Sequence, residues 1–391
     1  MAKKYCKNRK SPRNVKVTVK KVSENTTRTV PLTVKPKPET YITSMLGSGK
    51  VDFQNGSNNV QTENKLPHIK TLEKKVLKYI VGQDDQVRQL ITAIYRAKSF
   101  GSIKSNVLII GNSGTGKTAT VVEVAKRLNI PYTIEDATKY TQEGYYGADV
   151  NEMIFNLLEN AENDIERAQN GIIIIDEIDK KSGHDEHDVS GVEVLKSLLK
   201  IIEGTVIKIP SKDYFSGSME DFNTKNLVII FLGAFSGLGK IRDRRLNKQP
   251  LGFSISEPKK EDKQKSKYLK QDLVEYGMPE EFVGRIDTII EMNNLTKENL
   301  ASILKDSKLS IFRKYEKELS KRGVSLEYDE KLFELIAEAS LVLDTGAREL
   351  ANTVNRIFEN ISYDIFSNKN NYKKCKLFLD IVKDNTKYEL S

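Results

Sequence analysis

The chain has 391 residues and a formal net charge of +9; 38% of its residues are hydrophobic and 30% are charged. This composition predicts a largely globular, soluble protein of about two or three structural units. The longest apolar run, residues 227–232, is too short to cross a bilayer, and no apolar signal-peptide core follows the basic start. Two cysteines, Cys6 and Cys375, exclude a disulfide framework and a four-cysteine zinc module, which indicates a reducing, cytoplasmic environment.

The positive charge is concentrated near the amino terminus. Residues 1–60 contain 13 Lys and Arg against 3 Asp and Glu, which leaves 50 basic and 51 acidic residues for the rest of the chain. Residues 15–20 alternate apolar and polar side chains, as a half-buried strand does, and a Gly-, Ser- and Asn-rich stretch runs to residue 59. Residues 1–63 are therefore expected to be a basic arm, either a small β-element or disordered, with a linker, and able to bind an acidic partner.

From residue 64 the chain alternates helical and strand patterns. Helical spacing is found at residues 72–80, 84–97 and 119–128, and short apolar runs that predict buried strands are found at 107–110, 172–175 and 227–232. Strands that alternate with helices indicate an α/β domain with a parallel sheet, which we assign to residues 64–294. A charged stretch within it, residues 242–270, predicts a long surface loop.

The last part of the chain, residues 295–391, predicts a small helical domain. Its helical patterns cover residues 297–305, 312–320, 330–339 and 347–363. No strand is predicted in this part.

A phosphate-binding pattern, G-x-x-x-x-G-K-[ST], lies between a predicted strand and a predicted helix, the context that it requires. It consists of Gly111, Asn112, Ser113, Gly114, Thr115, Gly116, Lys117 and Thr118. The glycines let backbone N–H groups surround phosphate oxygens, and the following helix directs its positive end toward them. We expect Lys117 to reach the β- and γ-phosphates and the Thr118 hydroxyl to coordinate Mg²⁺.

Two carboxylates, Asp176 and Glu177, follow the apolar run 172–175. Because ligands of open α/β sheets bind at the carboxyl ends of the strands, both are expected at the nucleotide. Asp176 would hold Mg²⁺, and Glu177 would orient and deprotonate the attacking water. Either motif alone could be a solvated turn or strand end, but the two together favour a nucleoside triphosphatase.

From about residue 68 onward, further segments resemble the ClpX family of AAA+ unfoldases. Residues 79–83 are similar to the family segment that contacts adenine, which assigns Tyr79 and Ile80 to the nucleotide. Residues 144–150 resemble the first pore loop, in which Tyr145 and Tyr146 would grip a polypeptide. Residues 188–205 match the stretch that follows the second pore loop.

The resemblance also implies how subunits and partners are engaged. Arg285, in a segment similar to the family's arginine-finger segment, would reach the nucleotide of a neighbouring subunit, and Arg348 would be the second-sensor arginine that contacts nucleotide and supports catalysis. Leu251, Gly252 and Phe253 resemble the tripeptide that docks onto the ClpP peptidase. The resemblance thus implies an α/β AAA+ P-loop ATPase with a parallel-sheet large domain and a helical small domain, ATP and Mg²⁺ as cofactors, protein substrates and a hexameric ring.

The sequence departs from the family pattern in three places. We expect no zinc-binding amino-terminal domain in residues 1–63, because Cys6 has no cysteine nearby. Residues 209–214 stand where a basic pore-entrance motif is expected, so recognition of degradation tags stays open. The strand that ends near residue 235 offers only Ser236 as a weak first sensor.

The expected function is ATP-dependent unfolding and translocation of proteins, with delivery to a ClpP-type peptidase. Three alternatives remain: a remodelling chaperone without a peptidase, a nucleic-acid ATPase that uses the basic arm, and a nucleotide-gated scaffold without catalysis. The slightly acidic main body disfavours the second, and Glu177 disfavours the third. His184 and His187 are expected to be solvated loop residues rather than metal ligands.

Overall fold

The computed structural model describes residues 66–100, 104–140, 152–182, 189–210, 219–247, 267–341, 346–367 and 372–391. The basic arm, residues 1–63, lies outside these ranges, and its structure stays a prediction. Within the described ranges, no helix combines the length and the apolar character that crossing a bilayer would need.

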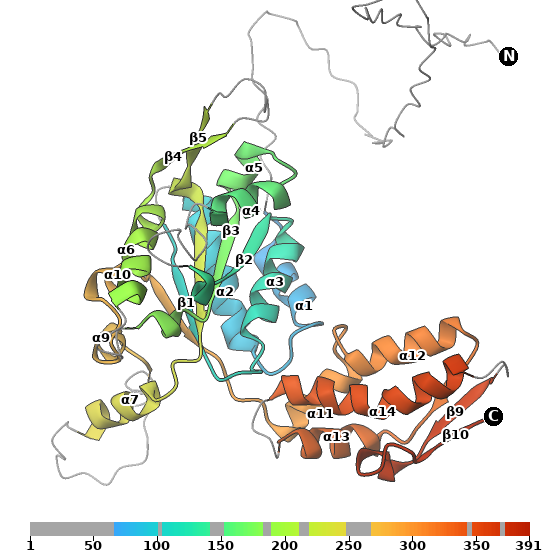
Figure 1. Cartoon of the computed structure of the whole chain (residues 1–391). Helices are drawn as coiled ribbons and strands as arrows, with labels where there is room; N and C mark the ends of the chain where they lie inside the picture. The colour runs from blue at the N-terminus through green and yellow to red at the C-terminus, as the bar shows by residue number, and fades with distance from the viewer. Residues whose placement is uncertain are drawn as a thin grey trace, which may run out of the picture. The chain divides into compact units, whose positions relative to one another are not determined.

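A parallel sheet of five strands, in the order β2-β3-β6-β1-β7, forms the centre of the α/β part (Figure 1). The strands are β1 (Val107–Ile110), β2 (Tyr132–Asp136), β3 (Ile172–Asp176), β6 (Val228–Gly233) and β7 (Thr288–Glu291). The predicted strands β1, β3 and β6 are confirmed. The strands β2 and β7 were not predicted, because their short sequences mix polar and apolar residues.

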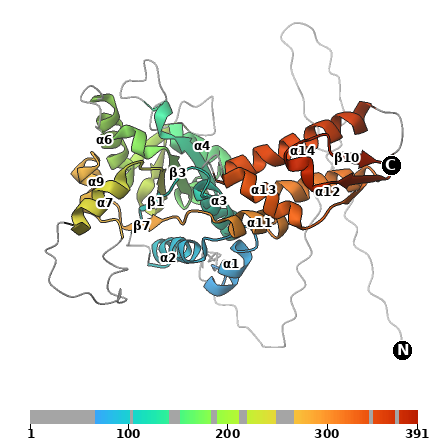
Figure 2. The same ribbon diagram turned by 90° about the horizontal axis from the view of Figure 1, so that it is seen from below.

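Helices cover both faces of this sheet, since alternate strand residues point in opposite directions. Ile109 and Ile174 belong to a core shared with α1 (Ile69–Val76), α2 (Asp84–Phe100) and α3 (Lys117–Leu128). Leu108 and Ile173 belong to a second core with α4 (Glu152–Asn160) and α6 (Val189–Glu203). Figure 2 shows α1 and α2 on one side of the strands and α4 and α6 on the other. Burial on both faces explains the uninterrupted apolar runs in the sequence.

Shorter elements connect these layers. They are α5 (Ile165–Gln169), α7 (Leu238–Asn247), α9 (Lys270–Glu275), α10 (Glu280–Gly284), the antiparallel hairpin of β4 (Val206–Pro210) and β5 (Met219–Asn223), and the 3-10 turns η1 (Ala137–Lys139), η2 (Ile178–Lys181) and η3 (Thr224–Asn226).

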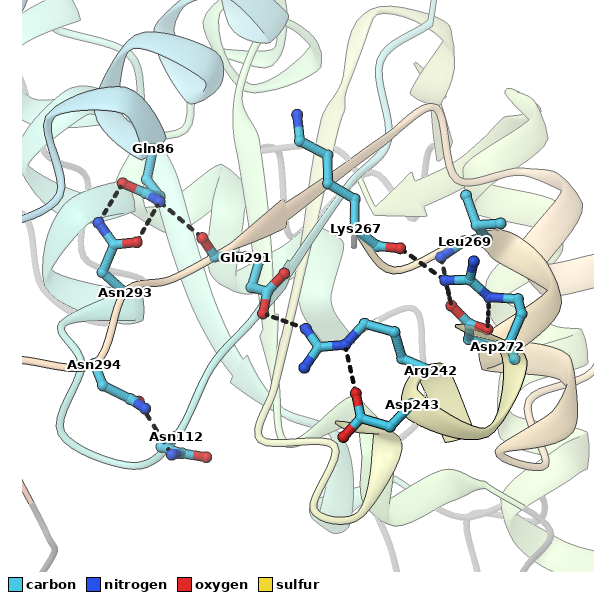
Figure 3. Close-up of polar contacts among 11 residues, drawn as sticks. Gln86, Asn112, Arg242, Asp243, Lys267, Leu269, Asp272, Glu291, Asn293 and Asn294 are labelled. Carbon is cyan, nitrogen blue, oxygen red and sulfur yellow. Dashed lines mark hydrogen bonds and ion pairs between the residues drawn. The ribbon is translucent and has the colours of Figure 1, made fainter. Parts of the chain in front are cut away.

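The charged stretch 242–270 is not one long loop, so this prediction was wrong at both ends. Its first residues belong to α7, and its last residue begins α9. Arg245 donates bonds of 2.7 Å and 3.0 Å to the two carboxylate oxygens of Asp272, which is only 1% exposed. Asp272 is labelled in Figure 3. A sequence does not show whether a charged residue is solvated or forms an ion pair with a residue on another element, so the error was unavoidable. Residues 248–266 lie outside the described ranges.

The C-terminal part is helical, as predicted, but it also contains a sheet. Its helices are α11 (Lys297–Lys305), α12 (Ile311–Lys321), α13 (Lys331–Leu341), α14 (Ala347–Ser367) and the turn η4 (Leu379–Val382). The strands β8 (Ser325–Glu327), β9 (Lys374–Leu377) and β10 (Tyr388–Leu390) form a sheet in the order β10-β9-β8. The prediction missed these strands because three or four residues are too few to establish a period of two.

Candidate functional site

The phosphate-binding loop connects the end of β1 to the start of α3. Gly114 and Gly116 adopt left-handed backbone angles, with φ of +77° and +91°, which residues with a Cβ rarely adopt. The Thr115 hydroxyl donates a bond of 2.8 Å to the carbonyl oxygen of Asn112 and so closes the loop on itself. The loop therefore presents the start of α3 at the carboxyl edge of the sheet, where an anion is favoured.

Lys117 is the first residue of α3, and its ammonium group folds over the loop. Its Nζ donates bonds of 2.6 Å to the carbonyl oxygen of Gly111 and 3.1 Å to that of Asn112. Burial lowers the pKa of Lys117 and the positive charge of Arg348 acts in the same direction, whereas the carboxylate of Asp176 raises it. Lys117 thus lies among the residues expected to bind phosphate.

The phosphate loop and the end of β3 meet at Thr118 and Asp176, which are 58 residues apart in sequence. The Thr118 hydroxyl donates a bond of 3.0 Å to Asp176 Oδ2. A hydroxyl and a carboxylate are hard oxygen ligands of the kind that Mg²⁺ prefers beside nucleotide phosphates. These two residues therefore fit the proposed Mg²⁺ site.

Glu177 directly follows this pair and turns out of the strand. Its backbone is left-handed, with φ of +58°, and its N–H donates a bond of 2.9 Å to Asp176 Oδ1. Its side chain is exposed. The arrangement separates the roles of the two carboxylates, because Asp176 is engaged by Thr118 while Glu177 is free to face a water molecule.

A cavity of about 210 Å³ lies beside the loop, between the α/β part and the C-terminal helices. Tyr79, Ile80, Thr115 and Gly116 line one side of it. The C-terminal part contributes residues that we did not predict, namely Leu295, Ile303, Leu304, Ser307, Leu309, Ile311, Leu350 and Ala351. This mostly apolar lining suits a flat heterocycle such as adenine.

The start of α14 contacts the phosphate loop directly. The N–H of Ala347 donates a bond of 3.1 Å to the carbonyl oxygen of Gly114. The exposed Arg348 follows in the first turn of the helix, and its charge acts on Lys117. The structure thereby brings the expected second-sensor segment to the phosphate loop.

The connection between β7 and α11 is also tied to the loop. Gln83, which is 1% exposed, donates bonds of 3.2 Å to the carbonyl oxygen of Thr115 and 2.8 Å to that of Asn293. Asn112 Nδ2 donates a bond of 3.1 Å to Asn294 Oδ1 (Figure 3). No role was predicted for Gln83 itself, although its place next to Gly82 in the segment expected to contact adenine was a usable signal.

Arg285 lies at the opposite edge of the sheet. Asn106, just before β1, donates a bond of 2.9 Å to the carbonyl oxygen of Arg285, whereas Gly111 follows the other end of β1. A strand of this length separates the two edges by roughly 13 Å. The side chain of Arg285 is 55% exposed, and its guanidinium group pairs with Glu203. The expected finger thus lies at the edge of the sheet opposite the phosphate loop of its own chain.

Comparisons with known proteins agree with this geometry. A sequence profile of the AAA domain (Cdc48 subfamily) matches residues 102–289, and one of the C-terminal, D2-small domain of ClpB protein matches residues 295–376. The ATP-dependent Clp protease ATP-binding subunit ClpX of Borrelia duttonii is 36% identical over 325 residues, which cover 78% of this chain and 76% of the relative. This chain belongs to the ClpX family. The ClpX of Treponema denticola is 34% identical over 320 residues, which cover 76% of this chain and 77% of the relative.

Membership of the ClpX family makes the chain an AAA+ ATPase that binds nucleotide. Five residues expected from that family lie outside the described ranges: Tyr145, Tyr146, Leu251, Gly252 and Phe253. His184 and His187, expected to be solvated loop residues, also lie outside them. Ser236 is exposed beyond the end of β6, and the neighbouring Phe235 N–H donates a bond of 3.1 Å to Asp179 Oδ2. The described residues contain no cluster of three or more His, Cys, Asp or Glu that could hold a metal ion by themselves.

Proposed function

We propose that this ClpX-family ATPase assembles into a hexameric ring in the cytoplasm, unfolds proteins at the cost of ATP, and threads them toward a ClpP-type peptidase. The position of Arg285 carries the proposal. Its exposed guanidinium group lies across the sheet from Lys117, so a complete ATPase site needs the arginine of a neighbouring subunit.

The chemistry at this shared site is mainly positioning and charge neutralisation. Bound ATP would supply the scissile phosphoanhydride, and a Mg²⁺ ion held here would neutralise part of its negative charge. Lys117 and the loop N–H groups bind the phosphates, while Thr118 and Asp176 provide the oxygens that suit the cation. Glu177 accepts the proton of the attacking water. Arg348 of the same chain and Arg285 of a neighbouring subunit add positive charge beside the phosphates.

Two further functions of the ring, gripping the polypeptide and selecting clients, are assigned to other residues. Tyr145 and Tyr146 grip the polypeptide in the central channel. The basic arm, residues 1–63, selects clients by their acidic surface and takes no part in catalysis. Deleting it should leave the basal ATPase rate unchanged, and the binding of acidic clients should weaken with salt.

The main test is a substrate trap. A Glu177→Gln ring incubated with ATP should retain client proteins, which are then identified by mass spectrometry. Lys117→Ala, which should lose ATP binding, serves as the matched control. Recovery of nucleic acid in place of protein would favour the nucleic-acid ATPase, and recovery of neither would contradict the proposal.

Delivery to a peptidase is tested separately, because the relatives are named as subunits of a Clp protease. A buried Leu or Phe contributes about 1.5–3 kcal/mol, so one docking loop binds weakly and several loops on a ring bind tightly. The double variant Leu251→Ala and Phe253→Ala should keep the ATPase and unfolding activities and lose degradation by the ClpP of the same cell. If the wild type does not bind that ClpP, the free-standing remodelling chaperone is the better conclusion.

A further inference from the structure

A second cavity, of about 340 Å³, shares Tyr79 with the cavity beside the phosphate loop. We call it the Tyr79 pocket, and the residues that line it are Lys75, Lys78, Tyr79, Lys126, Arg127 and Lys308. All of them except Tyr79 are basic, and none of the described residues that line the pocket is acidic. Residues 61–391 contain 50 basic and 51 acidic residues, so the composition of the chain does not account for this concentration of positive charge.

Most of the positive charge in the Tyr79 pocket is not balanced by a carboxylate. The buried Glu123 accepts a bond of 2.9 Å from Arg127 Nη2 and lies 4.0 Å from Lys126 Nζ, so one carboxylate serves two cations. The other three lysines of the pocket form no ion pair with any residue that the structure describes. Because like charges repel one another, such a cluster destabilises the folded chain until an anion neutralises it.

Arg127 carries a hydrogen-bond donor that the fold leaves unused. Its Nε is buried and has no partner among the described residues, whereas its Nη2 binds Glu123. Buried donors in native proteins are nearly always paired with protein, water or ligand atoms. The side chain of Arg127 is 31% exposed, so its guanidinium group has room to turn toward an anion in the pocket and use this donor.

Backbone and ring contacts hold the pocket in place before any ligand binds. The N–H of Lys308 donates a bond of 3.1 Å to the carbonyl oxygen of Lys78, and the Ser307 hydroxyl donates one of 2.7 Å to that of Tyr79. The centroid of the Tyr79 ring lies 4.2 Å from the guanidinium carbon of Arg127 and 5.6 Å from Lys308 Nζ, distances at which an aromatic ring attracts a cation. Groups that are already ordered lower the entropic cost of binding.

Charge and size together indicate the class of ligand. Ammonium and guanidinium groups are the usual partners of phosphate oxygens in proteins. A single phosphate group carries at most about two negative charges, too few for this cluster, whereas a chain of linked phosphates gains charge with each unit. The volume of the pocket suits a small molecule, since nucleic-acid backbones are bound along extended basic grooves.

We propose that the Tyr79 pocket binds a short chain of linked phosphates, such as tripolyphosphate, at a site separate from the phosphate loop. Lys75, Lys78 and Lys308 supply the charge that no carboxylate balances, and Arg127 donates its unused N–H to a phosphate oxygen. The inference does not rest on the proposed function, because binding of this anion requires neither ATP hydrolysis nor a ring.

Calorimetric titration of tripolyphosphate into the full-length protein tests the site. ADP at saturating concentration is present throughout, so that nucleotide occupies the phosphate loop. Lys75→Met and Lys308→Met each remove one ammonium group, the first from α1 and the second from the connection between α11 and α12. Each should raise the Kd for tripolyphosphate at least about tenfold, because each deletes a hydrogen bond between charged groups.

Two control variants locate the ligand. Lys74 is exposed, lies next to Lys75 in α1 and is not among the lining residues, so Lys74→Met removes the same charge from the same helix and should leave the Kd unchanged. Lys117→Ala, titrated without ADP, disables the phosphate loop and should also keep the Kd for tripolyphosphate. The basic arm, residues 1–63, is identical in every variant, so any tripolyphosphate that it binds cancels in the comparison.

The inference is overturned if the wild type binds no tripolyphosphate, or if Lys75→Met and Lys308→Met both bind it as tightly as the wild type. Loss of binding in Lys117→Ala would also overturn it, since the anion would then lie at the phosphate loop. Single-stranded DNA is titrated in the same way. If its binding is weakened by the two pocket substitutions and that of tripolyphosphate is not, the pocket binds a nucleic-acid backbone and the inference is wrong. None of these outcomes bears on the proposed function.

Discussion

The N–H of Ala347 donates a hydrogen bond of 3.1 Å to the carbonyl oxygen of Gly114, which joins the start of α14 to the phosphate loop. The residue before it, Gly346, has a φ of +56°, and a Cβ added there would lie 3.0 Å from the same carbonyl oxygen. The C-terminal part and the phosphate loop are therefore in contact through backbone atoms, at a point where no side chain fits without displacement.

Gly346→Ala should weaken ATP binding, because the new methyl group pushes α14 and Arg348 away from the phosphate loop. We expect the KM for ATP to rise about tenfold, which corresponds to roughly 1.4 kcal/mol. Gly323→Ala is the control, since Gly323 also has a positive φ, +81°, but nothing lies within 4 Å of its added Cβ. Equal effects of both substitutions on the KM would show that backbone strain alone is responsible.

Glu177→Gln should bind ATP normally and hydrolyse it about 10²–10⁴-fold more slowly, because the water loses its base while Lys117 and Thr118 remain in place. Steady-state turnover and equilibrium nucleotide binding measure the two effects. Glu162→Gln makes the same change at another exposed glutamate with a left-handed backbone, φ +60°, and should leave turnover unchanged. Near-normal turnover in Glu177→Gln would remove Glu177 from the mechanism.

Arg285→Ala should reduce ATP hydrolysis by about 10³-fold or more, the usual contribution of an arginine finger. Mixing Arg285→Ala subunits with Glu177→Gln subunits should restore part of the activity, because some interfaces then combine an intact Glu177 with an intact Arg285. Arg244→Ala is the control, since Arg244 is similarly exposed and pairs with Glu275 at 3.1 Å. Mixtures that stay inactive would argue against action between subunits.

Lys98 should make stability depend on pH. Its Nζ donates to the carbonyl oxygens of Asn170 and Asn226, and burial lowers the pKa of Lys98 from 10.5 to about 8. Between these two values the unfolded chain binds more protons than the native protein, so the free energy of unfolding rises with pH. Below about pH 8, Lys98 is protonated in both the native and the unfolded protein. The burial of its charge then lowers the free energy of unfolding by its full amount.

Urea denaturation checks this expectation. The free energy of unfolding of the wild type relative to Lys98→Met should rise by on the order of 1 kcal/mol between about pH 7.5 and 9.5. Lys126, whose side chain is 51% exposed, provides the control variant Lys126→Met, which removes an ammonium group at the surface. A flat difference for Lys98→Met would mean that the ammonium group is solvated in the native protein.

The sequence by itself was sufficient for those features whose physical cause is local. The runs 107–110, 172–175 and 227–232 predicted β1, β3 and β6, because a strand buried on both faces needs continuous apolar residues. The pattern from Gly111 to Thr118 predicted the phosphate loop, because its glycines and its lysine act within a few residues of one another. The carboxylates Asp176 and Glu177 followed from their place at a strand end.

The tertiary structure alone decided which distant polar groups meet. Arg245 was expected in a charged surface loop, yet it pairs with the buried Asp272, and Gln83 joins Thr115 to Asn293 across more than 200 residues of sequence. The bond of 2.6 Å from the hydroxyl of Tyr140 to Glu135 also corresponds to no pattern in the sequence. A hydrogen bond has no periodicity along the chain, because its partner is set by how helices and strands pack, and so these contacts could not be predicted from the sequence.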